Sequence, residues 1–383
     1  MRLSLRFPLA ALLLVPATLA AQTAGQAEVR PGQFRAPEFP PPSILDYQPR
    51  STLVVPVHLV PRAKYPAVDL HGHPPTLIPP EAIQRVVGAL DSLNVRVMIN
   101  ASGTSGQRLT QQIEAVKAAG VSDRFGFFTA LNLRDVGPGS GAIIAAQLEA
   151  DVKAGAVGLG EIGKGFGMSI KKKDGTRLQL DEPELDPVWQ MAAKLKIPVF
   201  IHVGDPAEFW SPLDFHNERW LELALFADRR YQDHVRYPDF ETLMAERDRL
   251  FARHPNTTFV IAHLGWHAND LARLGALFDR FPNLYSEVGA VLYDLGRQPR
   301  AARAFFVKYQ DRILFGKDSF QPEEYPYYWR VFETEDEYFD YYRGYHAFWK
   351  MYGMGLPDSV LQKLYFRNAL KIIPAMPHAG FPK

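Results

Sequence analysis

Cysteine is absent from the 383 residues of this chain. The protein therefore has no disulfide bond, no thiolate nucleophile and no N-terminal cysteine that could carry a lipid. Any metal ion would have to be bound by nitrogen and oxygen ligands, which suit zinc, manganese and iron.

An excess of charge of one sign and a long apolar run are also lacking. Lys and Arg together number 43 and Asp and Glu 42, and the two signs are mixed along the chain, so no nucleic acid is expected as a partner. After the first residues, no segment approaches the roughly 20 apolar residues that a membrane-spanning helix needs. We therefore expect no stable membrane insertion, and a small molecule as the substrate.

The first 21 residues have the pattern of a secretory signal peptide. Arg2 and Arg6 precede an apolar stretch from Pro8 to Ala20, and small residues suited to a signal peptidase follow. Cleavage near Ala20 or Ala21 predicts an exported protein, periplasmic or secreted. Residues 22–50 are rich in proline and predict an extended arm in front of the main domain.

Eight short apolar runs predict β-strands between residues 51 and 373. They cover residues 66–71, 95–99, 125–131, 156–161, 198–202, 258–263, 284–288 and 313–317. Stretches with helical periodicity lie between most of them, one with Gly155 as its predicted C-cap and another with Asp186 as its predicted N-cap. The alternation predicts a TIM-type (β/α)8 barrel with a tail at 374–383, although a doubly wound open sheet gives the same alternation.

Two connections are too long for ordinary loops, and they follow predicted strands five and eight. The first covers residues 204–238; the second follows Asp318 and contains 13 aromatic residues between Tyr325 and Tyr352. Long loops at the carboxyl end of a barrel usually shape the substrate pocket. The aromatic residues either stack on a flat ligand or form a packed subdomain or subunit interface, which would make the protein a homodimer.

Residues able to bind a metal end several of these predicted strands. They are His71 and His73 in VDLHGH, Glu161 in AVGLGEIG, His202 in IPVFIHVG, His263 in TFVIAHLG and Asp318 in RILFGKDS. Each has an ordinary alternative, such as an ion pair of Glu161 with Lys164 or of Asp318 with Lys317. A barrel, however, gathers the carboxyl ends of its strands into one site, and ionisable groups there are costly to bury unpaired. Together, the six residues predict a metal centre.

The ordered motifs HGH, GEIG, FIHVG, IAHLG and FGKDS resemble those of the amidohydrolase superfamily. The ending KLYFRNALKII resembles the final helix of the amidohydrolase-related group that includes aminocarboxymuconate semialdehyde decarboxylase, and GEIG is similar to the fourth-strand motif of TatD-like hydrolases. The resemblance covers roughly Tyr65 to Ile373. It implies one or two divalent ions, with zinc expected first and manganese or iron as alternatives.

The resemblance also implies roles for individual residues. In a two-metal arrangement, His71, His73 and Asp318 bind one ion, His202 and His263 complete a second site, and Glu161 bridges the two. In a one-metal decarboxylase, His71, His73, His202 and Asp318 bind the ion and His263 is left for proton transfer.

We expect an enzyme, namely a hydrolase that uses metal-activated water on an amide, ester, lactone or phosphoester bond. Asp318 is the expected general base, with His263 as a second catalytic candidate. The alternatives are a non-oxidative decarboxylase of a carboxylated aromatic or enol-like acid, and a non-catalytic binding protein on a barrel scaffold. Further candidates for contacts with the substrate or with the metal ligands are Lys164, Asp205, His267, Arg343 and His346.

Overall fold

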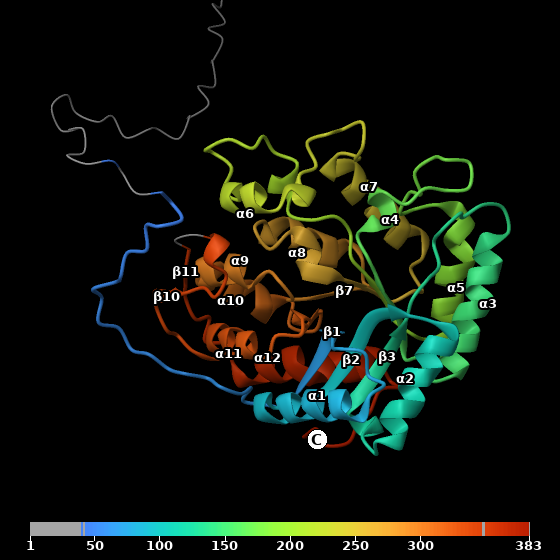
Figure 1. Cartoon of the computed structure of the whole chain (residues 1–383), viewed down its shortest axis with the longest axis horizontal. Helices are drawn as coiled ribbons and strands as arrows, with labels where there is room; N and C mark the ends of the chain where they lie inside the picture. The colour runs from blue at the N-terminus through green and yellow to red at the C-terminus, as the bar shows by residue number, and fades with distance from the viewer. Residues whose placement is uncertain (1–39, 41–42, 347–348, 383) are drawn as a thin grey trace, which may run out of the picture. The chain divides into compact units, whose positions relative to one another are not determined.

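The structure is a computed structural model that describes residues 40, 43–346 and 349–382 (Figure 1). It divides into two units, Met1–Pro49 and Arg50–Lys383. The predicted signal peptide and most of the predicted arm at 22–50 lie outside the described residues. In the first unit, the backbone amide of Asp46 donates a hydrogen bond to the carbonyl of Ser43, which forms a turn. No helix in the described part of the chain is long and apolar enough to cross a membrane.

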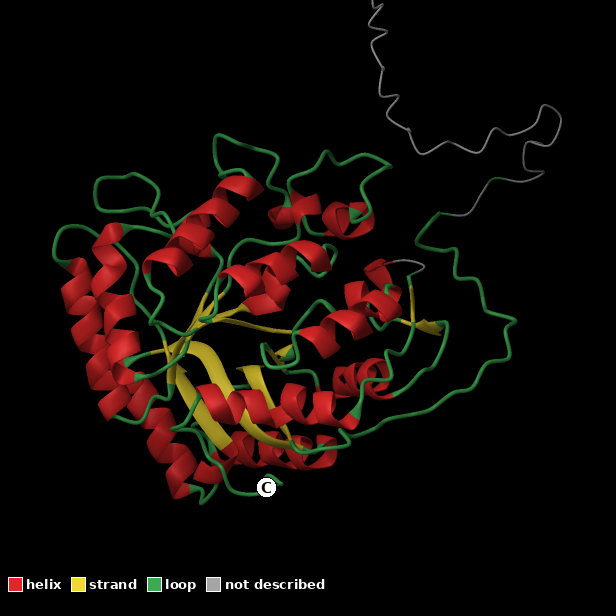
Figure 2. Ribbon diagram, turned by 180° about the vertical axis from the view of Figure 1, so that it is seen from behind, coloured by secondary structure: helices red, strands yellow, loops and turns green. Residues whose placement is uncertain are grey.

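Parallel strands form the centre of the second unit (Figure 2). They are β1 (Ala67–His73), β2 (Val95–Thr104), β3 (Phe125–Thr129), β4 (Gly158–Ile162), β5 (Val199–Ile201), β6 (Phe259–Ile261), β7 (Leu284–Glu287) and β8 (Ile313–Leu314). Each strand pairs in parallel with the next one along the chain. All eight predicted strands are present, with ends shifted by a few residues.

The end of the eighth strand closes the sheet onto the first. After β8 the chain continues into a short ninth strand, β9 (Asp318–Ser319), which pairs in parallel with β1 and sets Asp318 opposite Gly72. Between the two pieces, the amide of Leu70 donates a hydrogen bond to the carbonyl of Phe315 at 3.1 Å. Because the strands follow chain order and the two edges meet, the fold is the TIM-type barrel, and the open doubly wound sheet is excluded.

Helices cover the outside of the strands (Figure 2). The longer ones are α1 (Pro80–Leu93), α2 (Gly106–Ala118), α3 (Ser140–Lys153), α5 (Asp186–Leu195), α7 (Phe240–Arg253), α8 (Leu271–Arg280) and α10 (Pro299–Lys308). The shorter ones are α4 (Gly165–Met168), α6 (Trp220–Leu225), α9 (Leu292–Arg297), α11 (Tyr325–Glu333), α12 (Asp358–Gln362) and α13 (Asn368–Ile372).

Helix α1 shows how the local sequence produces these elements. Pro80 occupies its first turn, where a missing amide proton costs nothing, and Asn94 ends it in the left-handed region with φ 60°. The side chains of Ile83, Val86 and Leu90 recur every three or four residues and are buried. Burial of each contributes about 1.5–3 kcal/mol to stability, so the apolar stripe fixes which face packs on the sheet.

Two predicted helix caps can be compared with the structure. The predicted C-cap at Gly155 is wrong by one residue, because Ala154 is the C-cap of α3 and Gly155 follows it with φ 119°, a conformation that glycine adopts readily. The predicted N-cap at Asp186 is wrong by one residue, because α5 begins at Asp186 itself and Leu185 precedes it. Oδ1 of Asp186 lies 2.9 Å from Nε2 of His254, so the side chain serves a tertiary contact and caps no amide.

Both long connections follow the strands for which they were predicted. The first contains α6; the second contains α11 and a small hairpin of β10 (Phe339–Asp340) and β11 (Lys350–Met351). In α11, Tyr325, Tyr328 and Trp329 are completely buried, and the ring of Trp329 lies 4.6 Å from that of Phe315. These aromatic residues of α11 therefore form a packed subdomain on the barrel and present no face to a ligand.

Candidate metal centre

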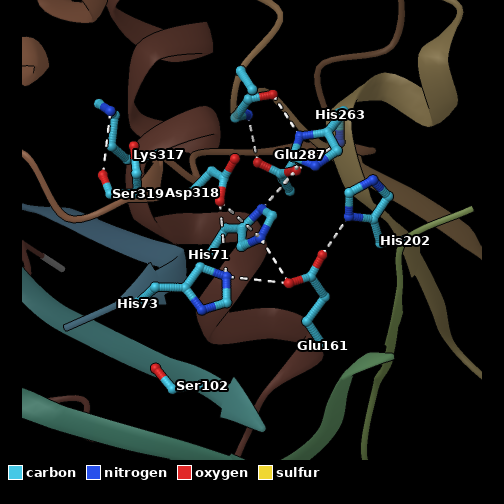
Figure 3. Close-up of polar contacts among 12 residues, drawn as sticks. His71, His73, Ser102, Glu161, His202, His263, Glu287, Lys317, Asp318 and Ser319 are labelled. Atoms are coloured by element: carbon cyan, nitrogen blue, oxygen red, sulfur yellow. Dashed lines mark hydrogen bonds and ion pairs between the residues drawn. The ribbon is translucent and has the colours of Figure 1, made fainter. Parts of the chain in front are cut away.

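His71 and His73 extend from β1 toward the carboxylate of Glu161 in β4 (Figure 3). Alternate residues of a strand share a face, which is why both imidazoles point the same way. Their Nε2 atoms lie 3.3 and 3.1 Å from Oε2 of Glu161. The His71 side chain has no exposed surface, whereas that of His73 is 29% exposed. His71 therefore lies at the inner end of the site, and His73 lies nearer the surface.

The second carboxylate oxygen of Glu161 faces a different histidine. Its Oε1 lies 2.6 Å from Nδ1 of His202, which follows β5 directly. Burial by itself would raise the pKa of Glu161, but the facing His71, His202 and His73 outweigh it and hold the pKa well below its usual range. One ionised carboxylate is thus shared by three histidines.

His263 follows β6 and lies next to His202, with 4.5 Å between the ring centroids. Its Nδ1 is 2.8 Å from the carbonyl oxygen of Gly289. Because a carbonyl only accepts, Nδ1 carries the proton and Nε2 keeps its lone pair. Burial and the charge of His202 lower the pKa of His263 to about 4, so the ring is neutral at pH 7, as a metal ligand must be.

Asp318 forms the outer wall of the site. Its Oδ1 lies 3.8 Å from Nε2 of both His71 and His73, and its side chain is 34% exposed. Burial opposes ionisation, but His71 and His263 more than compensate and lower the pKa of Asp318. The group is therefore a carboxylate at neutral pH and the most accessible of the six predicted ligands.

The structure brings all six predicted ligands together, and their chemistry fits a divalent ion. Among the described residues, one group with ligand atoms within 4.8 Å of one another is His71, His73 and Glu161, and a second is Glu161, His202 and His263. Nε2 of His202 is buried without any hydrogen-bond partner in the described part of the chain, and Nε2 of His71 has only the carboxylates of Glu161 and Asp318 beside it, at 3.3 and 3.8 Å. An unpaired buried nitrogen is costly, and a bound cation would pair it.

Glu287, the last residue of β7, is a functional residue that was not predicted from the sequence. This carboxylate is completely buried, and its Oε1 lies 3.2 Å from Nδ1 of His71 and accepts the backbone amide of His263 at 2.6 Å. A carboxylate behind a ligating histidine fixes the ring and its tautomer. The available signal was an acid near the end of the predicted strand 284–288, as Glu161 ends the predicted strand 156–161.

We expect Glu287→Gln to lower the affinity for the metal by about 10- to 100-fold while the fold persists. Both oxygens of Glu287 accept hydrogen bonds, and the side-chain NH2 of glutamine would face one of these N–H donors without being able to accept from it. Competition with a chelator of known affinity measures the change. Asp151→Asn is the matched control, since Asp151 is also buried and hydrogen-bonded but belongs to α3. Equal losses of affinity in both variants would contradict a role for Glu287 behind the ligands.

A cavity of about 160 Å³ lies over the carboxyl ends of the strands, and His202, His263 and Asp318 are in its wall. Two further predicted residues line it as an ion pair, with 2.7 Å between Nζ of Lys164 and Oδ2 of Asp205. Lys164 therefore pairs with Asp205, and Lys317 pairs with Glu324. Neither of the ordinary ion pairs considered for Glu161 and Asp318 forms.

The remaining three predicted residues differ in position. Arg343 lines the cavity, whereas His267 and His346 do not. His267 is buried 3.4 Å from a nitrogen of Arg247, and burial together with that charge lowers its pKa to about 2. Nε2 of His346 lies 3.4 Å from Oε2 of Glu222. The two histidines thus support neighbouring side chains and do not face the cavity.

A second ionic cluster in the cavity wall is centred on the carboxylate of Glu222. It accepts hydrogen bonds from Nε of Arg219 at 2.7 Å and from Nη1 of Arg229 at 2.6 Å. Burial alone would raise the pKa of Glu222, but His346 and Arg219 lower it to about 2 from an ordinary 4.5. The ionised carboxylate is therefore stabilised by folding.

This shift predicts how stability depends on pH. The folded pKa of Glu222 lies below the unfolded one, so its contribution is complete above pH 4.5 and is lost as the pH falls toward about 2. We expect Glu222→Gln to lower the free energy of unfolding by roughly 3 kcal/mol at about pH 6, and the difference from the parent to shrink near about pH 3. Urea titrations measure both values.

Glu241→Gln removes an exposed partner of Arg273 and serves as the control. It should change stability by less than about 1 kcal/mol. A difference between the parent and Glu222→Gln that stays constant with pH would contradict the expectation.

Known proteins with a similar sequence or fold identify the family of this chain. The family model described as Amidohydrolase matches residues 55–374. Among curated proteins, the comparison found no significant match. One similar solved structure is an uncharacterized TIM-barrel protein from Bordetella bronchiseptica, with 14% identity, a TM-score of 0.52, and coverage of 82% of this chain and 99% of the other.

A second similar solved structure is a dihydroxybenzoic acid decarboxylase from Polaromonas sp. JS666 with bound manganese and the inhibitor 2-nitroresorcinol. It has 16% identity and a TM-score of 0.50, and the match covers 81% of this chain and 97% of that one. At such identities the likeness concerns the barrel fold alone. The family match, in contrast, extends over most of the chain and includes every residue of the metal centre, so this protein belongs to the amidohydrolase family.

Proposed function

We propose that the protein is a metal-dependent hydrolase with two divalent ions that share Glu161. The observation that carries the proposal is the division of the Glu161 carboxylate, with Oε2 facing His71 and His73 and Oε1 facing His202. His71, His73 and Asp318 would hold one ion, and His202 and His263 the other. Bound there, the ions would supply an activated water and polarise the bond to be cleaved.

Side chains and backbone groups of the protein would transfer the proton and orient the metal ligands. Asp318 is ionised, reaches the cavity and can take a proton from water and return it to the leaving group. His263 is held in one tautomer by Gly289, and Glu287 holds His71. The bond cleaved is an amide, ester, lactone or phosphoester, and zinc is the ion we propose first, before manganese or iron.

A non-oxidative decarboxylase is the second candidate. The solved structures with names that specify a reaction support it better than they support hydrolysis, since a dihydroxybenzoic acid decarboxylase with manganese is among them. The resemblance of KLYFRNALKII to the group of aminocarboxymuconate semialdehyde decarboxylase points the same way. In that reaction one ion would be bound by His71, His73, His202 and Asp318, and His263 would carry the proton.

Metal content and a substrate screen separate the two candidates. Elemental mass spectrometry of the purified protein should find about two ions per chain, and a screen of esters, amides, lactones and phosphoesters should find turnover. One ion per chain, together with release of carbon dioxide from hydroxybenzoates, would overturn the hydrolase and support the decarboxylase. A chain that binds no divalent ion would refute both and support the binding protein.

We further propose that the protein is exported and forms a homodimer. The signal-peptide pattern at 1–21 supports export. Self-association is supported by aromatic residues of the second connection that stay exposed outside α11, such as Tyr338, which is 37% exposed. N-terminal sequencing of the mature protein should begin after Ala20 or Ala21. Light scattering coupled to size-exclusion chromatography should give twice the mass of the chain, and a monomer would refute the dimer.

A further inference from the structure

Arg343 is the one cation in the described cavity wall without a carboxylate partner. Within the described residues, Lys164 pairs with Asp205, and Arg219 and Arg229 both pair with Glu222, but no Asp or Glu lies within 4.0 Å of the Arg343 guanidinium. Among the described residues, its one ring contact is with Tyr342, whose ring centroid lies 5.6 Å from the guanidinium carbon. The guanidinium is permanently charged and partly buried, so it lacks both full hydration and a counter-ion.

The position of Arg343 connects this unpaired charge to the metal centre. It belongs to the connection that begins after Asp318, and both residues line the same cavity, together with His202 and His263. A group held by Arg343 would therefore place the rest of a small molecule against the metal ligands. The cavity volume of about 160 Å³ is below the roughly 300–1,000 Å³ of pockets for drug-sized ligands, so that molecule is small.

We propose that Arg343 binds a carboxylate of the substrate, which makes the substrate a small carboxylic acid whose reacting bond lies at the metal centre. The planar fork of a guanidinium matches a carboxylate with two parallel hydrogen bonds. One unpaired guanidinium also balances the single charge of a carboxylate, whereas a phosphate monoester carries about −1.5 to −2 at neutral pH. The inference rests on the proposed metal-dependent function and specifies its substrate class.

Calorimetric titration of the metal-loaded protein with three probes tests the proposal without requiring turnover. Benzoate, benzamide and phenyl phosphate share one ring and differ in the charged group. We expect benzoate to bind more tightly than the other two. Arg343→Met should lower the affinity for benzoate by about 10- to 100-fold and leave the affinity for benzamide unchanged, because only the hydrogen bonds to the charged carboxylate are lost.

Two further variants complete the design. Arg343→Lys keeps the charge without the fork and should retain part of the affinity for benzoate. Arg85→Met, at an exposed position of α1, is the control and should bind all three probes as the parent does. Metal content and thermal unfolding are measured for each variant. If Arg343→Met fails to fold, the affinity for benzoate is compared between the parent and Arg343→Lys instead. An affinity of Arg343→Lys equal to that of the parent would contradict the proposal.

Benzoate that binds equally well to the parent and to Arg343→Met would overturn the proposal, since the carboxylate would then be held by the metal or elsewhere. Phenyl phosphate that binds more tightly than benzoate through Arg343 would overturn the carboxylate class, and so would a parent protein that binds neither anion. Arg343-dependent binding of benzoate in a protein without hydrolytic activity would leave this proposal standing and refute the hydrolase alone.

Discussion

The Glu161→Gln variant is expected to hold about one divalent ion per chain where the parent holds two, and to lose about 1,000-fold or more in kcat/KM. Glutamine keeps the shape of Glu161 but removes the charge that His71, His73 and His202 face. Without that charge, the proposed second ion would lose the ligand that the two ions share. A 1,000-fold loss corresponds to about 4 kcal/mol of the barrier, which is within the several kcal/mol that a catalytic ion supplies.

Elemental mass spectrometry and steady-state kinetics on the substrate found by the screen measure the two effects. Glu114→Gln, an exposed residue of α2, controls for the loss of one carboxylate elsewhere and should behave as the parent. Full activity with two ions in Glu161→Gln would eliminate the bridging role. One ion in both the parent and the variant would instead make Glu161 a structural partner of the histidines and favour the decarboxylase.

Asp318→Asn is expected to lower kcat by about 100- to 10,000-fold, the range for loss of a general base. Asparagine cannot take a proton from water, and it places an amide where the parent has an ionised oxygen 3.8 Å from both His71 and His73. A group that acts only in the transition state affects kcat and kcat/KM equally, so KM should change little. Kinetics and metal content measured on the same samples provide the test.

Metal content separates the two roles of Asp318. If the variant keeps the metal content of the parent, the loss in kcat belongs to proton transfer. Loss of an ion in proportion to activity would assign Asp318 to binding alone. A variant that retains both the ions and the rate would remove Asp318 from the mechanism.

Local sequence patterns were sufficient for the existence and order along the chain of the eight strands, although the strand ends are shifted by a few residues. The apolar runs identified β1 to β8, and the side chains that follow them identified the six metal-ligand candidates. This succeeded because strand formation depends on neighbouring residues, and because a barrel brings all strand ends to one face. The boundary of α5 was misplaced because Asp186 has a tertiary partner in His254, which no local pattern contains.

Local patterns could not predict which side chains from distant segments form ion pairs across the barrel. Glu161 and Asp318 each had a lysine nearby in the sequence, yet those lysines pair with Asp205 and Glu324. His267 lies four residues after His263, and His346 lies with Arg343 in the aromatic connection, yet neither histidine lines the cavity. Sequence proximity misled here because the direction of a side chain in a long loop depends on packing against distant elements.

The sequence by itself determined the alternation of eight strands with helices and the ionisable groups at the strand ends, because these follow from periodicity and from the kind of residue at each strand end. That the sheet closes into a barrel, and is not an open doubly wound sheet, was decided by the strand order and by the pairing of β9 with β1 in the tertiary structure. Only the tertiary structure decided that Glu161 lies between two groups of histidines, that Glu287 supports His71, and that Arg343 faces the cavity without a carboxylate. These contacts join residues that are far apart along the chain. Their distances are set by the register of the closed sheet and by the folding of the two long connections onto it, and neither is encoded in any single segment.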